Sequence, residues 1–156
     1  MKNSLILIIA FFSFYTAAFA DCPFCNQNVI DRQSVFETES YHVLLDYKPR
    51  VKGHLLVVPK RHVVKAHELT GQEWNELSQI IPKVFNVFEN FLKTDQYIVL
   101  EKNGPKAYQE IPHVHFHLIP VHNQHWKEIF DVSPRQLSPA ELEKEKELFG
   151  SYFKEI

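Results

Sequence analysis

The sequence predicts an α+β domain with a five-stranded antiparallel sheet, one long helix and one C-terminal helix. Five short segments have the apolar composition of strands and follow one another in hairpin order. Two longer segments repeat their apolar residues at helical spacing behind helix-capping residues. Several strands in hairpin order together with two helices are typical of the α+β class.

The five strand-like segments are short and mostly apolar. The segment at residues 54–59 is apolar almost throughout, as expected for a buried strand. The strands are expected over residues 34–37, 41–45, 54–59, 97–101 and 112–120.

Both predicted helices begin with recognisable capping residues. Thr70 and Glu73 have the spacing of a capping box, and apolar residues recur at helical spacing behind them, so one amphipathic helix is expected over residues 70–92. Ser138 followed by Pro139 has the pattern of an N-cap and a first helical residue. The C-terminal helix should therefore begin there.

Length and charge limit the classes of function. The chain has 156 residues, enough for one domain, and 45% of them are hydrophobic, so a core can form. The net charge is -2, and acidic and basic residues are interspersed. The basic field that nucleic-acid binding requires is absent, and we expect no nucleic-acid partner.

The first twenty residues have the features of a secretory signal peptide. Lys2 gives a positive start, residues 5–14 are nearly all apolar, and Ala-Phe-Ala at residues 18–20 fits a signal peptidase site. The apolar run is short for a membrane span of about 20 residues. We therefore assign residues 1–20 to a signal peptide and residues 21–156 to the folded domain. The expected location is periplasmic or secreted, with no stable membrane anchor after cleavage.

Three histidines alternate with apolar residues near the end of the predicted sheet. Side chains of a strand point alternately to its two faces, so His113, His115 and His117 should share one face. Such histidines can bind zinc, because rings at positions i and i+2 can reach one ion. They can also act on a phosphate, because a neutral imidazole is a nucleophile near pH 7. The spacing alone does not decide between these two functions.

The surrounding residues resemble the signature of the histidine-triad (HIT) family of nucleotide hydrolases and transferases. Residues 103–120, NGPKAYQEIPHVHFHLIP, resemble its Gly-rich phosphate loop, its Gln and its alternating histidines. Leu45-Asp46 and residues 53–62, GHLLVVPKRH, also resemble the family, and Cys22-Pro-Phe-Cys25 resembles the opening of its bacterial branch. The resemblance covers most of residues 22–120. It implies a HIT-like fold and a homodimer in which the long helices meet.

The resemblance also implies a reaction and a set of site residues. The reaction is hydrolysis or transfer at a purine nucleoside phosphate, of the phosphoramidate or dinucleoside polyphosphate type, and its chemistry requires no cofactor. The nucleophile that forms a covalent nucleotidyl-histidine would be His115, with His117 and His54 binding the phosphate or holding the ring. The nucleotide-binding residues would be Phe24, Leu44, Asp46, Tyr47, Lys102, Asn103 and Gln109.

Two positions depart from the family pattern. Tyr108 stands where the family usually has glycine in the phosphate loop, and Lys102 stands where it commonly has a phosphate-binding Asn. Only glycine readily adopts positive φ, so the loop should be reshaped. A lysine can bind phosphate as a point charge. We expect both changes to affect the substrate and the rate more than the nucleophile.

The two cysteines have the spacing found in zinc and redox motifs. The resemblance implies a structural zinc held by Cys22, Cys25, His62 and His113, which would be a closed tetrahedral site. An oxidising compartment would instead favour a Cys22–Cys25 disulfide. Both states remain open, and the alternative function is a non-catalytic zinc- or nucleotide-binding module of the same fold.

Overall fold

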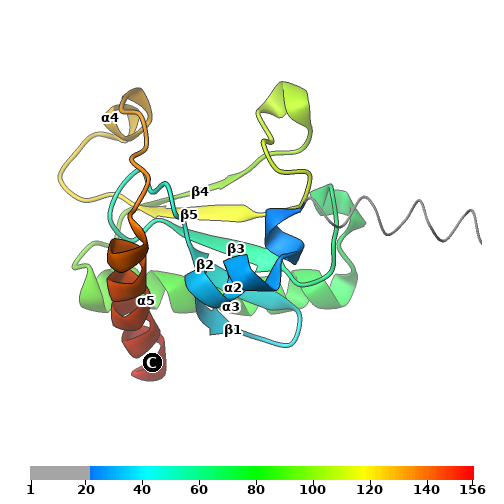
Figure 1. Ribbon diagram of the computed structural model, residues 1–156, viewed down its shortest axis with the longest axis horizontal. Coiled ribbons are helices and arrows are strands. Elements are labelled where there is room, and N and C mark those ends of the chain that lie inside the picture. The colour runs from blue at the N-terminus through cyan, green and yellow to red at the C-terminus, as the bar shows by residue number, and fades with distance from the viewer. Residues whose placement is uncertain (1–21) are drawn as a thin grey trace, which may run out of the picture.

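The computed structural model describes residues 22–156, and the predicted signal peptide lies outside the described residues. Five strands form one antiparallel sheet in the order β1-β2-β3-β5-β4, which confirms the predicted fold class (Figure 1). The strands are β1 (Ser34–Glu37), β2 (Tyr41–Leu45), β3 (Leu55–Pro59), β4 (Tyr97–Glu101) and β5 (Phe116–Pro120).

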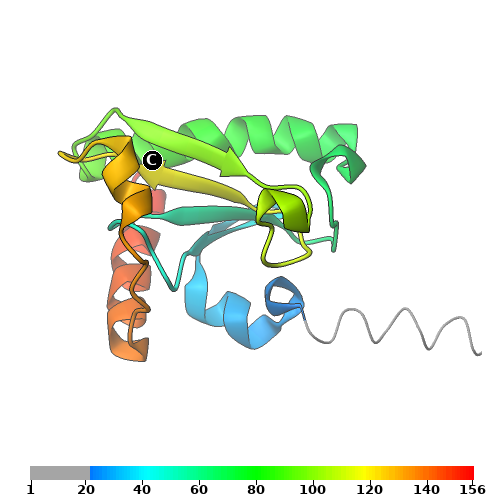
Figure 2. The ribbon, with the colours of Figure 1, turned by 90° about the horizontal axis from the view of Figure 1, so that it is seen from above.

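The two faces of the sheet pack against different parts of the chain. Alternate residues of a strand point to opposite faces, so Leu55 and Val57 of β3 belong to the larger core, whereas Leu56 and Val58 belong to a smaller cluster with Phe24. The long helix α3 runs along the first face, and the N-terminal segment with α2 (Gln27–Gln33) lies on the second (Figure 2). All five residues of β3 are buried because both of its faces are covered.

Helix α3 (Gly71–Phe91) confirms the helix predicted over residues 70–92. The Thr70 hydroxyl accepts a hydrogen bond from the Glu73 amide, and the Glu73 carboxylate accepts one from the Thr70 amide. Arg61 donates two hydrogen bonds to the same carboxylate and holds the pKa of Glu73 down at about 2. The capping box therefore also fastens the loop after β3 to the start of α3.

Helix α5 (Pro139–Lys154) confirms the predicted C-terminal helix, with Ser138 as its N-cap. Phe149 and Phe153 enter the larger core, and the Phe153 ring stacks on Phe36 of β1 at 5.1 Å. The helix lies beside β1 and α2. This position brings its first turns to the face of the sheet that carries the histidines.

The structure adds two short helices, α2 and α4 (Trp126–Asp131), to the two that were predicted. Three short 3-10 turns complete it: η1 (Pro23–Cys25), η2 (Ala66–Glu68) and η3 (Pro105–Ala107). The predicted strand at residues 112–120 is shorter than expected, because pairing with both neighbours ends at Phe116. Within residues 22–156, no helix has the length and apolar character that crossing a membrane requires.

Candidate active site

The histidine segment alternates as predicted. Its apolar side chains all enter the core under α3: Val114, Phe116 and Leu118. His115 and His117 face the opposite side, and their ring centroids lie 4.9 Å apart. Of the three histidines only His117 lies in β5: His113 is at a bend and His115 directly precedes the strand, so the prediction of one strand through all three was wrong in this respect. The face that they share is the one that carries the N-terminal segment.

The hydrogen bonding of His115 leaves one ring nitrogen available for chemistry. Its Nδ1 lies 2.7 Å from the His113 carbonyl oxygen, which can only accept, so Nδ1 carries the proton. The neutral ring then has its lone pair on Nε2. The ring is 7% exposed, and burial lowers the pKa of His115 below its ordinary value. It is therefore neutral near pH 7.

Two further histidines form a hydrogen-bonded pair beside the nucleophile candidate. His54 Nε2 lies 2.9 Å from His117 Nδ1. The Arg50 amide donates to His54 Nδ1 at 3.3 Å, which assigns the His54 proton to Nε2. His54 then donates to His117, and His117 presents an N–H at Nε2. One ring thus offers a lone pair and its neighbour offers a donor.

Burial keeps this pair uncharged. Desolvation, followed by the nearby positive charges, lowers the pKa of His54 to about 3 and that of His117 to about 2. Asp46 Oδ2 lies 3.3 Å from His54 Nδ1, which bears no proton in this tautomer, so the contact is not a hydrogen bond. Asp46 Oδ1 accepts a hydrogen bond from the Lys48 amide. Burial raises the pKa of Asp46. The site therefore combines neutral rings with one carboxylate at its edge.

These groups open onto a cavity of about 800 Å³. A cavity of this size is within the range that binds small molecules. The structure brings seven of the predicted residues to its wall: His54, His115, His117, Phe24, Asp46, Tyr47 and Lys102. Phe24 packs against the His115 ring with centroids 5.1 Å apart.

Three residues predicted to bind nucleotide do not line the cavity. Leu44 is fully buried in the small cluster behind the wall. Gln109 accepts a hydrogen bond from the Gly104 amide and donates one to the Val64 carbonyl, so its side-chain amide joins its own loop to the segment after β3. Asn103 bonds to the Ala66 amide and to Glu101. In this structure Gln109 and Asn103 shape the loop beside the cavity.

Other wall residues had no signal in the sequence. Arg50 places its guanidinium against the carbonyls of Ile129, Phe130 and Val132 at 3.3–3.5 Å and thereby fixes the end of α4. The far wall comes from the segment before α5 and from its first turns, including Leu137, whose amide donates to the Tyr47 carbonyl. These contacts join residues about 80 to 90 positions apart, which no local pattern reveals.

The four predicted metal ligands gather in a separate cluster, which we call the thiol–imidazole cluster (Cys22, Cys25, His62 and His113). Its ligand atoms all lie within 4.8 Å of one another. Cys22 Sγ is 3.3 Å from His113 Nδ1, and Cys25 Sγ is 3.2 Å from His62 Nδ1. Both cysteines are free thiols.

The cluster fits a zinc ion in donor type and in tautomer. Two sulfur and two nitrogen donors match a structural tetrahedral site. His113 Nε2 lies 2.9 Å from the Pro59 carbonyl, so its proton is on Nε2 and its lone pair on Nδ1 faces the sulfurs. The ring is fully buried. His113 is thus separated in function from His115, which is two residues away.

Comparisons with known proteins agree with this arrangement. The chain is 35% identical over 107 residues to adenosine 5'-monophosphoramidase HNT1 of Saccharomyces cerevisiae, which covers 67% of this chain and 65% of the yeast protein. It is 33% identical over 112 residues to bis(5'-adenosyl)-triphosphatase of Dictyostelium discoideum, covering 72% of this chain and 71% of that protein. The chain thus spans just under two thirds of the yeast enzyme. Both relatives are eukaryotic, and the comparisons give no support to the bacterial branch suggested by Cys22 and Cys25.

Solved structures share the fold. A hypothetical histidine triad nucleotide-binding protein from Sulfolobus tokodaii superposes with a TM-score of 0.72 at 26% identity, covering 86% of this chain and 93% of that one. The profile of the HIT domain family matches residues 27–124, which include His54, His115 and His117. The chain therefore belongs to the HIT domain family.

Proposed function

We propose that the protein is a HIT-type hydrolase or transferase that acts at the phosphate of a purine nucleotide, with a phosphoramidate or a dinucleoside polyphosphate as substrate. The observation that carries this proposal is the Nε2 lone pair of His115, which the bond from Nδ1 to the His113 carbonyl leaves free beside a cavity. The names of the two relatives, a phosphoramidase and a triphosphatase, agree with this reaction class.

The geometry supports a covalent route. His115 Nε2 attacks phosphorus and forms a nitrogen–phosphorus bond, while the bond from phosphorus to the leaving group breaks and its electron pair departs with that group. The substituted ring becomes positively charged, and the His113 carbonyl at 2.7 Å stabilises its Nδ1–H. His117 donates from Nε2 to a phosphate oxygen. Water or another acceptor then attacks phosphorus, the nitrogen–phosphorus bond breaks, and its electron pair returns to Nε2, which restores the neutral ring. The attacking group loses its proton to solvent.

The remaining predicted contacts place the nucleoside. Asp46 offers carboxylate oxygens that can accept from the ribose hydroxyls, and Phe24 and Tyr47 offer apolar surface to a purine base. Asp46 also contacts His54, so ribose binding and the histidine pair share one carboxylate.

The test is turnover of adenosine 5'-phosphoramidate and diadenosine triphosphate by the protein and by His115→Ala and His115→Asn. We expect both variants to lose at least about 1000-fold in kcat, because the nucleophile is gone. Circular dichroism and thermal unfolding should show that they remain folded. Turnover equal to that of the unchanged protein would remove the assignment. Nucleotide binding without turnover in any form would favour the non-catalytic module.

We also propose that the thiol–imidazole cluster holds a structural zinc ion. The donor set and the His113 tautomer support it. Metal analysis of protein purified under reducing conditions should give one zinc per chain, and Cys25→Ser should lose it. Protein that lacks zinc and is two hydrogens lighter in mass would indicate the Cys22–Cys25 disulfide instead.

Two proposals rest on the sequence and on the family resemblance. Residues 1–20 act as an export signal, and mass spectrometry of exported protein should find a chain that begins at Asp21. The mature protein forms a homodimer through its long helices, and light scattering should give twice the chain mass. Uncleaved protein or a monomeric mass would contradict the respective proposal.

A further inference from the structure

Lys102 lies beside the nucleophile candidate. Strands β4 and β5 pair Leu100 with His117 and Glu101 with Phe116. Pairing ends there, and Lys102 and His115 are the next residues beyond the last pair. Residues directly opposite in an antiparallel pair point to the same face and lie within contact distance. Both also line the cavity. Lys102 therefore lines the same cavity as the nucleophile candidate and lies close enough to His115 for its charge to act on that ring.

Among residues 22–156, four cationic side chains line the cavity: Arg32, Lys48, Arg50 and Lys102. Lys48 Nζ lies 5.2 Å from the centroid of the Tyr47 ring. The Arg50 guanidinium contacts three backbone carbonyls, and Arg32 donates from Nε to the Asn28 carbonyl. Lys102 has no ion pair or hydrogen bond to any residue within 22–156. Its charge contributes to the lowered pKa of His54, His115 and His117, which agrees with a position facing them.

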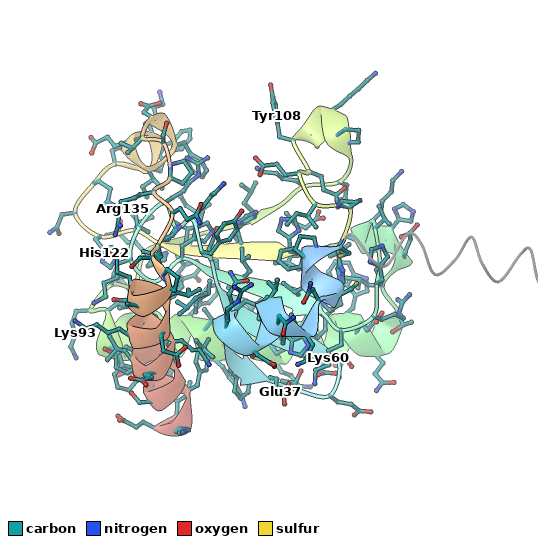
Figure 3. The ribbon with its side chains drawn as sticks, viewed as in Figure 1. Glu37, Lys60, Lys93, Tyr108, His122 and Arg135 are labelled. Carbon is teal, nitrogen blue, oxygen red and sulfur yellow. The ribbon has the colours of Figure 1, made fainter. Side chains whose placement is uncertain are left out.

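An exposed aromatic side chain, Tyr108, lines the same cavity as Lys102. Tyr108 is 79% exposed, and its backbone has a φ of 60°, in the left-handed region that non-glycine residues rarely adopt. Gln109 fixes the loop from both sides through Gly104 and Val64. The ring stands out from the η3 loop in Figure 3. The loop is thus held in a strained form that displays a flat ring to the solvent side of the cavity.

We infer that Lys102 and Tyr108 form a subsite for the leaving group, and that it selects an anionic nucleotide, such as a nucleoside diphosphate, over an amine. This inference rests on the proposed function and names its preferred substrate class. When a dinucleoside triphosphate reacts, the bridging oxygen takes the bond pair from phosphorus and leaves as part of a negatively charged diphosphate. An adjacent ammonium stabilises that charge. An amine must instead gain a proton to leave, and a neighbouring ammonium does not assist this. The departing base can stack on Tyr108.

The test compares kcat/KM for diadenosine triphosphate with that for adenosine 5'-phosphoramidate. Lys102→Met should lower the value for the triphosphate at least about tenfold more than it lowers the value for the phosphoramidate. Lys102→Arg, which keeps the charge, should restore the preference. Tyr108→Ala should raise KM for the triphosphate alone. The matched control is Lys106→Met, since Lys106 is an exposed lysine in η3 outside the cavity wall. Equal losses on both substrates, or none on either, would overturn the inference.

A binding measurement separates this inference from the proposed function. Calorimetry should show that the protein binds ADP about tenfold more tightly than AMP, and that Lys102→Met removes the difference. If neither substrate is turned over, the proposed function fails, and the calorimetry still decides whether this subsite recognises the additional phosphate. Equal affinity for ADP and AMP in the unchanged protein would contradict the subsite.

Discussion

Two groups of histidines lie within a few residues of each other and differ in almost every physical respect. In the thiol–imidazole cluster, His113 is fully buried, and both of its ring nitrogens have protein partners. In the cavity, His115 has a protein partner at Nδ1 that leaves Nε2 with a lone pair. The ring nitrogens of His113 are both occupied by protein contacts, whereas Nε2 of His115 remains available to a substrate.

The difference shows that neighbours from other strands decide what a histidine does. His113 meets the cysteines of the N-terminal turn, whereas His117 meets His54 from the start of β3. Phe24, between the two cysteines, packs against both His113 and His115. The Phe24 ring therefore lies between the thiol–imidazole cluster and the cavity histidines, and we call it the shared wall.

The largest expected effects come from replacing His115 and His113 separately with alanine. His115→Ala should lower turnover at least about 1000-fold and leave the free energy of unfolding within about 1 kcal/mol. His113→Ala should cost about 2–4 kcal/mol, because it empties a buried site and leaves the Pro59 carbonyl unpaired. Urea unfolding and kinetic assays on the same preparations measure both. A His113 variant with normal stability and no turnover would show that the roles are not separate.

A smaller effect follows from pH. The pKa values of His54 and His117, about 3 and about 2, lie below the ordinary value of 6.5. Below pH 6.5 the unfolded chain therefore binds protons that the folded protein excludes. Stability should be complete above pH 6.5 and fall as the pH decreases, by up to about 1.4 kcal/mol per pH unit for each ring.

Urea unfolding between pH 5.5 and pH 8 tests this dependence. The His117→Asn variant is the control. Its unfolding free energy should depend less steeply on pH, by an amount that corresponds to roughly one bound proton. The raised pKa of Asp46 acts in the opposite direction as the pH falls, so an Asp46→Asn variant measured over the same range isolates the contribution of the rings. A stability that does not change with pH would contradict the neutral, desolvated state of the pair.

The smallest expected effect is at the shared wall. Phe24→Leu keeps an apolar side chain but removes the ring that touches His113 and His115. We expect a loss of about 1 kcal/mol in unfolding free energy and a rise of about threefold to tenfold in KM, with kcat little changed. Steady-state kinetics measure the changes in KM and kcat separately. A large fall in kcat with constant KM would mean that Phe24 positions the nucleophile directly.

Local sequence patterns predicted the parts of the fold that local patterns determine. The capping residues Thr70 and Ser138 start the two predicted helices, and alternation gave the buried face of the histidine segment. Helix α2 was missed because only Ile30 and Gln33 are buried, which leaves no apolar repeat. Helix α4 was missed because Arg50, about 80 residues earlier in the chain, holds its end.

In the site, too, some residues were predictable from the sequence and others depend on tertiary contacts. His54, Asp46 and Lys102 were predicted through the resemblance to the HIT family, and the structure brings all three to the cavity. Leu44 lies behind the wall, because the N-terminal turn covers its face of the strand, and closeness in sequence to Asp46 does not show this. Leu137 reaches the wall only through the path of the C-terminal segment, which is fixed by tertiary contacts.

The most direct test of the account is to trap the intermediate on the enzyme. The protein is mixed with diadenosine triphosphate, quenched within milliseconds under alkaline conditions, and digested for mass spectrometry. We predict one adenylyl group on the peptide that contains His115, and none in His115→Asn. Turnover without any adduct, or an adduct on His113 or His117, would contradict the assignment of His115 as the nucleophile.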